Sequence, residues 1–157
     1  MFSRWFDDTF QSLRNPQYRT LWMGTTVAFL AFMMSSIVQS IVAFDLTGKN
    51  GAVGIVALGQ GLATICISPF GGVIADRVSK RKLVLIGQSV IGLNFLSVGI
   101  LIVADSITIP VLVSSTFVMG AVFSFIGPAR QAWIGELVGG DEMGNAIAMQ
   151  EVGMTLT

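Results

Sequence analysis

The side chains best suited to chemistry form one short cluster, an aspartate followed by basic residues, between two long apolar runs. Its five charged residues fall within seven positions: Asp76, Arg77, Lys80, Arg81 and Lys82. Residues 52–75 contain no ionisable side chain except the thiol of Cys66, and residues 83–104 contain none. A carboxylate beside these cations allows a charged network at a membrane surface, where it stays ionised at little cost. The cluster therefore predicts a short charged turn between two membrane spans.

Few residues suit enzymatic chemistry. Histidine, the commonest general base and metal ligand, is absent. The single cysteine, Cys66, lies in an apolar segment, so neither a disulfide framework nor a metal cluster can form within the chain. A membrane enzyme would need convergent ionisable residues inside the bilayer, and the apolar runs offer none. We therefore predict that the protein is not an enzyme and holds no metal.

The composition indicates a membrane protein. Of the 157 residues, 53% are hydrophobic and 11% are charged, whereas soluble domains carry about 25% charged residues. Nine basic and nine acidic residues leave no net charge, so the chain lacks the basic footprint of a nucleic-acid-binding protein. We expect an all-α protein whose main partner is the lipid bilayer.

Four uncharged runs are long enough to cross a hydrocarbon core of about 30 Å as helices. They cover residues 20–44, 52–75, 83–104 and 107–127. A fifth apolar run begins at Gly144 and does not reach the length of a span within this sequence. A helix that ends partway through lipid leaves carbonyl groups unsatisfied. We therefore expect the chain to be an amino-terminal fragment, with the carboxy-terminal remainder of the same chain as a partner.

Two segments outside these runs are amphipathic. Residues 1–19 are expected to form a cytoplasmic domain with a helix on the membrane surface over residues 2–14. Asn15 and Pro16 end that helix and place Tyr18, Arg19 and Trp22 at the lipid interface. A second interfacial helix is expected to start at Gly127 and to end at 139–140.

Polar side chains within the spans are few. Ser36, Gln39 and Ser40 share one helical face, and Gln88 and Asn94 are the strongest polar groups of the third run. These five residues could line a polar cavity. Alternatively, the serines bond to their own helix and Gln39 bonds to a neighbouring helix.

Glycines are frequent in the second run, and Pro69 should kink it. We interpret these glycines as sites of close helix packing. They are Gly54, Gly59, Gly61, Gly71 and Gly72.

The distribution of basic residues predicts the orientation. Eight of the nine lie before the first run, after the second or after the fourth, and only Lys49 lies on the other side. Because short loops rich in lysine and arginine remain in the cytoplasm, we expect a multi-pass plasma-membrane protein with a cytoplasmic amino terminus. Glu151, in the fifth run, either lies at the interface or takes part in proton coupling.

The spacing of the charged turn resembles the signature loop between the second and third spans of the major facilitator superfamily. The matching residues are Gly72, Asp76, Arg77, Ser79, Lys80, Arg81 and Lys82, with Ser79 where the family usually has glycine. Further segments look like the efflux branch that includes enterobactin exporters and macrolide efflux proteins: 44–48, 127–132 and 145–146. In the 127–132 segment, Gly127, Pro128, Arg130 and Gln131 correspond to a cytoplasmic loop motif.

This resemblance implies a twelve-helix transporter made of two six-helix halves, of which the chain would form most of the first. Members of that family export small molecules such as drugs, siderophores or metabolites by alternating access, commonly in exchange for protons and without a bound cofactor. In them, the aspartate that matches Asp76 caps a helix of the opposite half and stabilises the outward-open state. Thr116 stands where many proton-coupled exporters carry arginine.

Another function class also fits the composition and the topology. A four-span membrane scaffold or accessory subunit without transport activity would show the same apolar runs, but it would not require Gly72 and Asp76 at this spacing.

Overall fold

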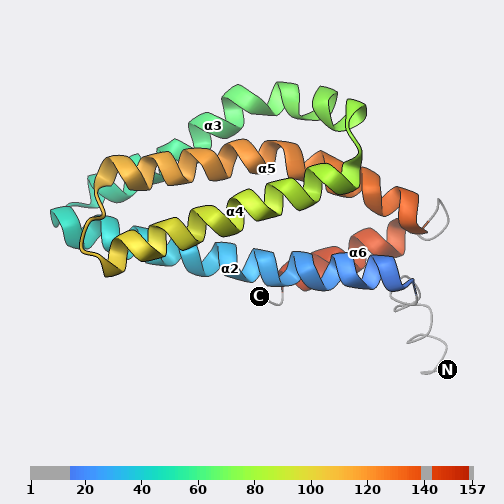
Figure 1. Cartoon of the computed structure of the whole chain (residues 1–157), viewed down its shortest axis with the longest axis horizontal. Coiled ribbons are helices and arrows are strands. Elements are labelled where there is room, and N and C mark those ends of the chain that lie inside the picture. Colours follow the sequence, from blue (N-terminus) through green and yellow to red (C-terminus); the bar gives the residue numbers. More distant parts are fainter. Residues whose placement is uncertain (1–14, 139–142, 156–157) are drawn as a thin grey trace. The chain divides into compact units, whose positions relative to one another are not determined.

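The structure, a computed structural model, describes residues 15–138 and 143–155, and within these ranges every regular element is a helix (Figure 1). The helices are α2 (Pro16–Thr47), α3 (Asn50–Arg77), α4 (Lys80–Val103), α5 (Ile109–Val138) and α6 (Met143–Thr155). Four of them, α2 to α5, are long and apolar enough to cross a membrane, and α6 is a shorter fifth helix. The predicted all-α membrane fold is confirmed. The amphipathic helix expected over residues 2–14 lies outside the described residues.

Contacts divide the chain into two units. Unit 1 contains the described residues up to Met33 and from Gln131 onward, and unit 2 contains Met34–Arg130. Unit 1 therefore holds the first half of α2, the end of α5 and all of α6. Unit 2 holds the second half of α2, all of α3 and α4, and most of α5.

Local sequence signals set both ends of α2. The Asn15 side chain caps its amino terminus, because Oδ1 accepts hydrogen bonds from the backbone N–H groups of Gln17 (3.0 Å) and Tyr18 (3.4 Å). Pro16 occupies the first helical position, where no N–H donor is needed. At the other end Gly48 adopts φ +63°, and its N–H donates to the carbonyl of Phe44 (2.7 Å).

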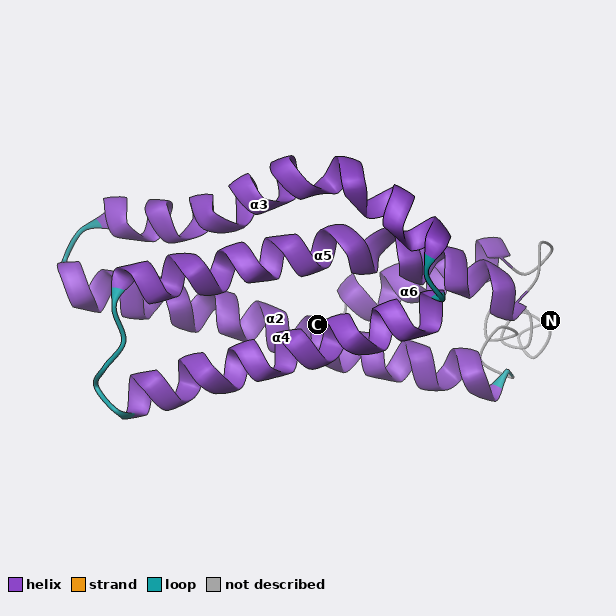
Figure 2. Ribbon diagram, turned by 45° about the horizontal axis from the view of Figure 1, so that its top comes forward, coloured by secondary structure: helices purple, strands orange, loops and turns teal. Residues whose placement is uncertain are grey.

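The turn between α4 and α5 is a Schellman motif built on an aspartate. The N–H of Ser106 donates to the carbonyl of Leu101 (3.0 Å), and that of Asp105 donates to Ile102 (3.1 Å). Asp105 takes the left-handed position with φ +51°, which usually belongs to glycine. Teal segments in Figure 2 show this turn and the short connection between α3 and α4.

The core of unit 2 lies near its two outer turns, and all four helices of the unit contribute to it. We call this set the turn-end cluster: Ala43, Val56, Val98, Ile107 and Leu112. Further contacts give the relative directions of these helices. The contacts of Gly59 and Gly120 show that α3 and α5 run in the same direction. The contacts of Gly87 with Ile126 and of Asn94 with Ser115 show that α4 and α5 run in opposite directions. Since short turns join α2 to α3 and α3 to α4, α2 and α4 run in the same direction.

Close approach of main chains joins α3 to α5. A Cβ atom at Gly59 would lie 2.5 Å from Thr116 Oγ1 and 2.7 Å from the Val113 carbonyl oxygen. A Cβ at Gly120 would overlap the carbonyl oxygen of Gln60. Gly54 and Gly61 have no heavy atom within 4 Å of the same position. The predicted close packing therefore applies to some glycines of α3 and not to others.

The helix α5 continues through Pro128 to Val138, so the prediction of a separate helix starting at Gly127 is wrong, whereas the end of the membrane span near Gly127 stays a prediction. Proline leaves the carbonyl four residues earlier, that of Ser124, without its helical donor. The main chain of α3 lies against that oxygen, because a Cβ at Gly71 would overlap it. The close packing of α3 at this point covers the freed carbonyl while α5 remains helical.

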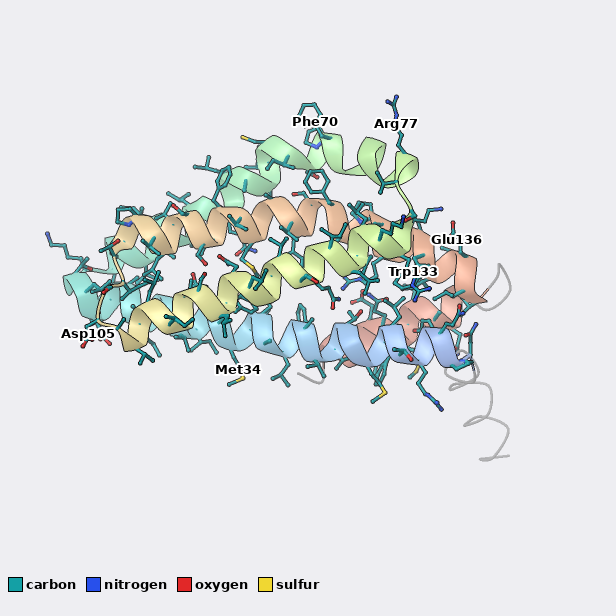
Figure 3. The ribbon with its side chains drawn as sticks, in the orientation of Figure 1. Met34, Phe70, Arg77, Asp105, Trp133 and Glu136 are labelled. Carbon is teal, nitrogen blue, oxygen red and sulfur yellow. The ribbon has the colours of Figure 1, made fainter. Side chains whose placement is uncertain are left out.

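The outward faces of unit 2 are apolar. Exposed side chains include Ile65 (74%), Leu93 (66%) and Val103 (87%), and Figure 3 shows Met34 and Phe70 pointing away from the helices. Such surfaces are unfavourable in water over so large an area, so they are suited to lipid.

Candidate functional site

The charged turn joins α3 to α4 through two residues. The helix α3 ends at Arg77 and α4 begins at Lys80, so Val78 and Ser79 make the connection. Ser79 has φ −59° and ψ 120°, and its carbonyl accepts a hydrogen bond from the N–H of Leu83 (3.0 Å). Because this conformation is open to any L-residue, serine fits the position where the resembled family usually has glycine.

Three of the four cations of this turn are exposed. Arg77, Arg81 and Lys82 are exposed and Lys80 is half-buried; Figure 3 shows Arg77 extending away from the helices. Asp76 belongs to the last turn of α3, but its side chain lies outside what the structure describes. Gly72 is exposed on the same helix.

The first turn of α4 concentrates positive charge. It contains three cations and no acidic residue, and the Ser79 side chain makes no capping hydrogen bond. The amino terminus of a helix already carries a partial positive charge. This end of unit 2 is therefore suited to hold a carboxylate or another anion.

The polar face expected on α2 is divided in the structure. Gln39 is buried (4% exposed), and its Nε2 donates to Ser35 Oγ (3.0 Å). Ser36 is exposed, and Ser40 donates to the carbonyl of Ser36 on its own helix (2.8 Å). Of the three predicted residues, only Gln39 faces the interior of unit 2. Ser35 was not among the predicted cavity residues.

The polar groups of α4 have different environments. Asn94 Nδ2 donates to Ser115 Oγ (2.9 Å) and lies 3.3 Å from the Ser115 carbonyl oxygen, so it links α4 to α5. Gln88 is half-buried. Thr116, at the place of the arginine of proton-coupled exporters, donates to the carbonyl of Val56 on α3 (2.7 Å). This threonine therefore connects two helices.

The segment predicted as a cytoplasmic loop motif is helical. Gly127, Pro128, Arg130 and Gln131 all lie within α5; Gly127 and Arg130 are half-buried, and Gln131 is exposed. The physical reason is the packing of Gly71 against the carbonyl that Pro128 frees, as described above.

Unit 1 contains a set of contacts that the sequence analysis missed. Tyr18 is buried (1% exposed), and its hydroxyl donates to the carbonyl of Ala146 (2.7 Å). Trp22 Nε1 donates to the carbonyl of Met149 (2.8 Å). These two bonds attach α6 to α2, and the place of Tyr18 and Trp22 at the lipid interface stays a prediction. Both acceptors are main-chain carbonyls, which carry no sequence signal.

The amino-terminal half of α2 has two further contacts, one with α5 and one with α6. Asn15 Nδ2 donates to the carbonyl of Leu137 in the last turn of α5 (2.8 Å), where helical carbonyls lack partners. A Cβ at Gly153 would lie 2.7 Å from Thr26 Oγ1. Since the partners advance together along both helices, α2 and α6 run in the same direction.

In the described part of the chain, groups able to bind a metal are not brought together. Among residues 15–138 and 143–155, no three His, Cys, Asp or Glu side chains are placed to hold one ion. Cys66 is free and exposed, and Glu151 is exposed on α6.

Comparison with protein families gives a match over almost the whole chain. Residues 7–157 match the family described as transmembrane secretion effector. No curated protein sequence and no solved structure matches the chain. The match agrees with the alternating helix directions and with the charged turn between α3 and α4. The chain belongs to the transmembrane secretion effector family of major facilitator transporters.

Proposed function

We propose that this protein is a secondary active transporter that exports a small molecule, such as a drug, a siderophore or a metabolite, by alternating access. The observation that carries the proposal is the two-residue connection between α3 and α4. It gathers four cations at the end of two helices whose membrane-crossing parts are uncharged. A scaffold would not need such a turn. In a transporter with two conformational states, contacts made by the turn can stabilise one state more than the other.

We assign the switching role to Asp76 together with the cations of the turn. A carboxylate near a helix amino terminus gains about 0.3–1 kcal/mol, and up to about 2 kcal/mol when partly buried. States of a transporter separated by a few kcal/mol change population several-fold when such a contact is lost. Exchange for protons is the coupling that the family resemblance supports, with Glu151 as a further carboxylate for that exchange.

Export can be tested directly in cells that carry the complete protein. Cells are loaded with ethidium, and the rate of its loss is compared with that of cells carrying the empty vector. We expect faster loss with the transporter and a return to the control rate after an uncoupler dissipates the proton gradient. Equal rates with and without the protein would contradict export of such cations, and export that survives the uncoupler would contradict proton exchange.

The proposed location is the inner or plasma membrane, with the amino terminus in the cytoplasm. Lys49 and Asp105 lie in the turns beside the turn-end cluster, and Ser79 lies at the other end of unit 2. Single cysteines at these positions, in a Cys66→Ser background, are exposed to an impermeant thiol reagent on intact cells. Labelling at Lys49→Cys and Asp105→Cys but not at Ser79→Cys is expected; the reverse pattern would contradict this orientation.

A further inference from the structure

One face of α4 carries exposed apolar side chains along almost the whole helix. They recur every three or four positions, which is the spacing of a single helical face. We call this set the outer face of α4, and each member is more than half exposed: Leu85, Ile86, Leu93, Leu96, Ile100 and Val103. Two serines lie beside it, Ser89 and Ser97, and their hydroxyls donate to carbonyls of α4 itself (2.9 and 2.8 Å). The outer face is therefore suited to hydrocarbon chains.

Basic residues lie at one end of this outer face. Arg81 and Lys82 are exposed in the first turn of α4, one helical turn before Leu85 and Ile86. Arg77, at the adjoining end of α3, is exposed as well and extends away from the helices in Figure 3. The four cations of the turn outnumber its single carboxylate, and the amino terminus of α4 adds a partial positive charge. This end of the outer face therefore attracts anions.

The other end of the outer face has a different charge. It lies at the turn between α4 and α5, which contains Asp105 and no basic residue. The turn between α2 and α3, also beside the turn-end cluster, adds only Lys49. The outer face thus combines a long apolar surface with a basic cluster at one end alone, which is complementary to a lipid with acyl chains and a negative headgroup.

We propose that Arg81 and Lys82 bind the phosphate of an anionic phospholipid, such as phosphatidylglycerol, whose acyl chains lie along the outer face of α4. The stems of arginine and lysine can lie on apolar surface while their charged ends reach the headgroup. A zwitterionic lipid offers the same phosphate, but its ammonium group is repelled by the cluster. The inference adds a binding partner and does not depend on the proposed export function.

The length of a lipid limits the part of the outer face that it covers. Half of a hydrocarbon core is about 15 Å thick, which corresponds to about ten residues of helix. A lipid held at Lys82 therefore reaches about as far as Leu93. Ile100, on the same outer face, contacts lipids of the opposite leaflet, where no basic cluster selects the headgroup.

The test measures lipid contact at single positions of the complete protein in phosphatidylcholine nanodiscs. A fluorescent label on Ile86→Cys, in a background without other cysteines, is quenched by contact with lipids that carry a nitroxide on an acyl chain. We expect nitroxide-labelled phosphatidylglycerol to give half of the maximal quenching at a concentration at least about fivefold lower than nitroxide-labelled phosphatidylcholine does. The same label on Ile100→Cys should be quenched equally by both lipids.

Two sets of variants separate charge from other causes. Arg81→Gln combined with Lys82→Gln should abolish the preference at Ile86→Cys, whereas Arg81→Lys combined with Lys82→Arg should keep it. The matched control is Lys49→Gln, which removes a cation at the other end of unit 2 and should leave the preference unchanged. High salt should weaken the preference, because the cations are exposed.

Two results would overturn the proposal. The first is equal quenching by the two lipids at Ile86→Cys with both cations present, or a preference that persists after both are removed. The second is the absence of quenching by either lipid at Ile86→Cys, with normal quenching at Ile100→Cys, which would show that protein covers this end of α4.

Discussion

Two helix pairs, one in each unit, are joined by different means. In unit 1, α2 contacts α6 through large side chains: Tyr18 and Trp22 donate to carbonyl oxygens of α6. In unit 2, α3 and α5 contact each other through their main chains, which can approach closely because Gly59 and Gly120 have no side chain. Lipid is as apolar as leucine, so burial alone does not hold helices together in a membrane, and hydrogen bonds and close packing take over.

The difference has consequences for how each pair tolerates change. Side-chain hydrogen bonds can be removed one at a time. In a membrane protein each lost bond lowers the free energy of unfolding by about 0.6 kcal/mol on average and by up to about 1.7 kcal/mol. An added methyl group at a main-chain contact forces both helices to move. The contact between α3 and α5 should therefore be the more sensitive of the two.

The largest effect is expected at Gly120. Gly120→Ala places a Cβ against the carbonyl oxygen of Gln60, which cannot move alone, so we expect a loss of about 1–3 kcal/mol in the free energy of unfolding. The measurement is the apparent unfolding temperature in detergent. Gly61→Ala is the matched control on α3: its Cβ meets no atom within 4 Å, and alanine favours helix, so stability should not fall. Equal losses at the two sites would contradict the main-chain contact.

A smaller effect is expected at Tyr18. Tyr18→Phe keeps the buried ring and removes the hydroxyl that donates to Ala146, so stability should fall by about 0.6–1.7 kcal/mol. Native-state hydrogen exchange of the α6 amides should rise in the variant, because α6 is held by this bond. Tyr18→Phe with unchanged exchange in α6 would show that the ring alone attaches the helix. Thr20→Ala, whose hydroxyl bonds to Pro16 on its own helix, is the control.

The smallest effect on stability is expected outside both helix pairs, and it is a gain. Asp105 occupies a left-handed position at the end of α4, which costs an L-residue about 1 kcal/mol. Asp105→Gly should therefore raise the unfolding temperature by a few degrees, with a gain below about 1 kcal/mol, since glycine also loses more backbone entropy on folding. A lower unfolding temperature would mean that the aspartate side chain makes a stabilising contact of its own.

The sequence was sufficient for features that depend on composition along one helix. Uncharged runs predicted four membrane-length helices, because a charge in lipid is costly wherever its neighbours lie. The sequence was insufficient where contacts with a neighbouring helix determine the local structure. Pro128 signalled a helix end, but Gly71 lies against the carbonyl that this proline frees. Tyr18 was predicted at a lipid interface, but its hydrogen bond to a carbonyl of α6 could not be predicted from the sequence of α2.

The candidate site shows the same limit. The three residues Ser36, Gln39 and Ser40 share a face by spacing, yet only Gln39 is buried. Which part of that face points inward depends on how α4 and α5 pack, and one helix alone does not contain that information. The charged turn, in contrast, could be placed from sequence, since it is defined by the ends of two neighbouring helices.

The central claim is that the charged turn between α3 and α4 controls a conformational cycle and takes no part in substrate binding. The most direct measurement compares the export rate and the substrate affinity of Asp76→Asn with those of the wild type, using the complete protein in liposomes. Asp105→Asn, in the turn at the other end of unit 2, is the control. We expect export to fall at least about fivefold while affinity stays within about threefold. Normal export, or a loss explained entirely by weaker affinity, would contradict the claim.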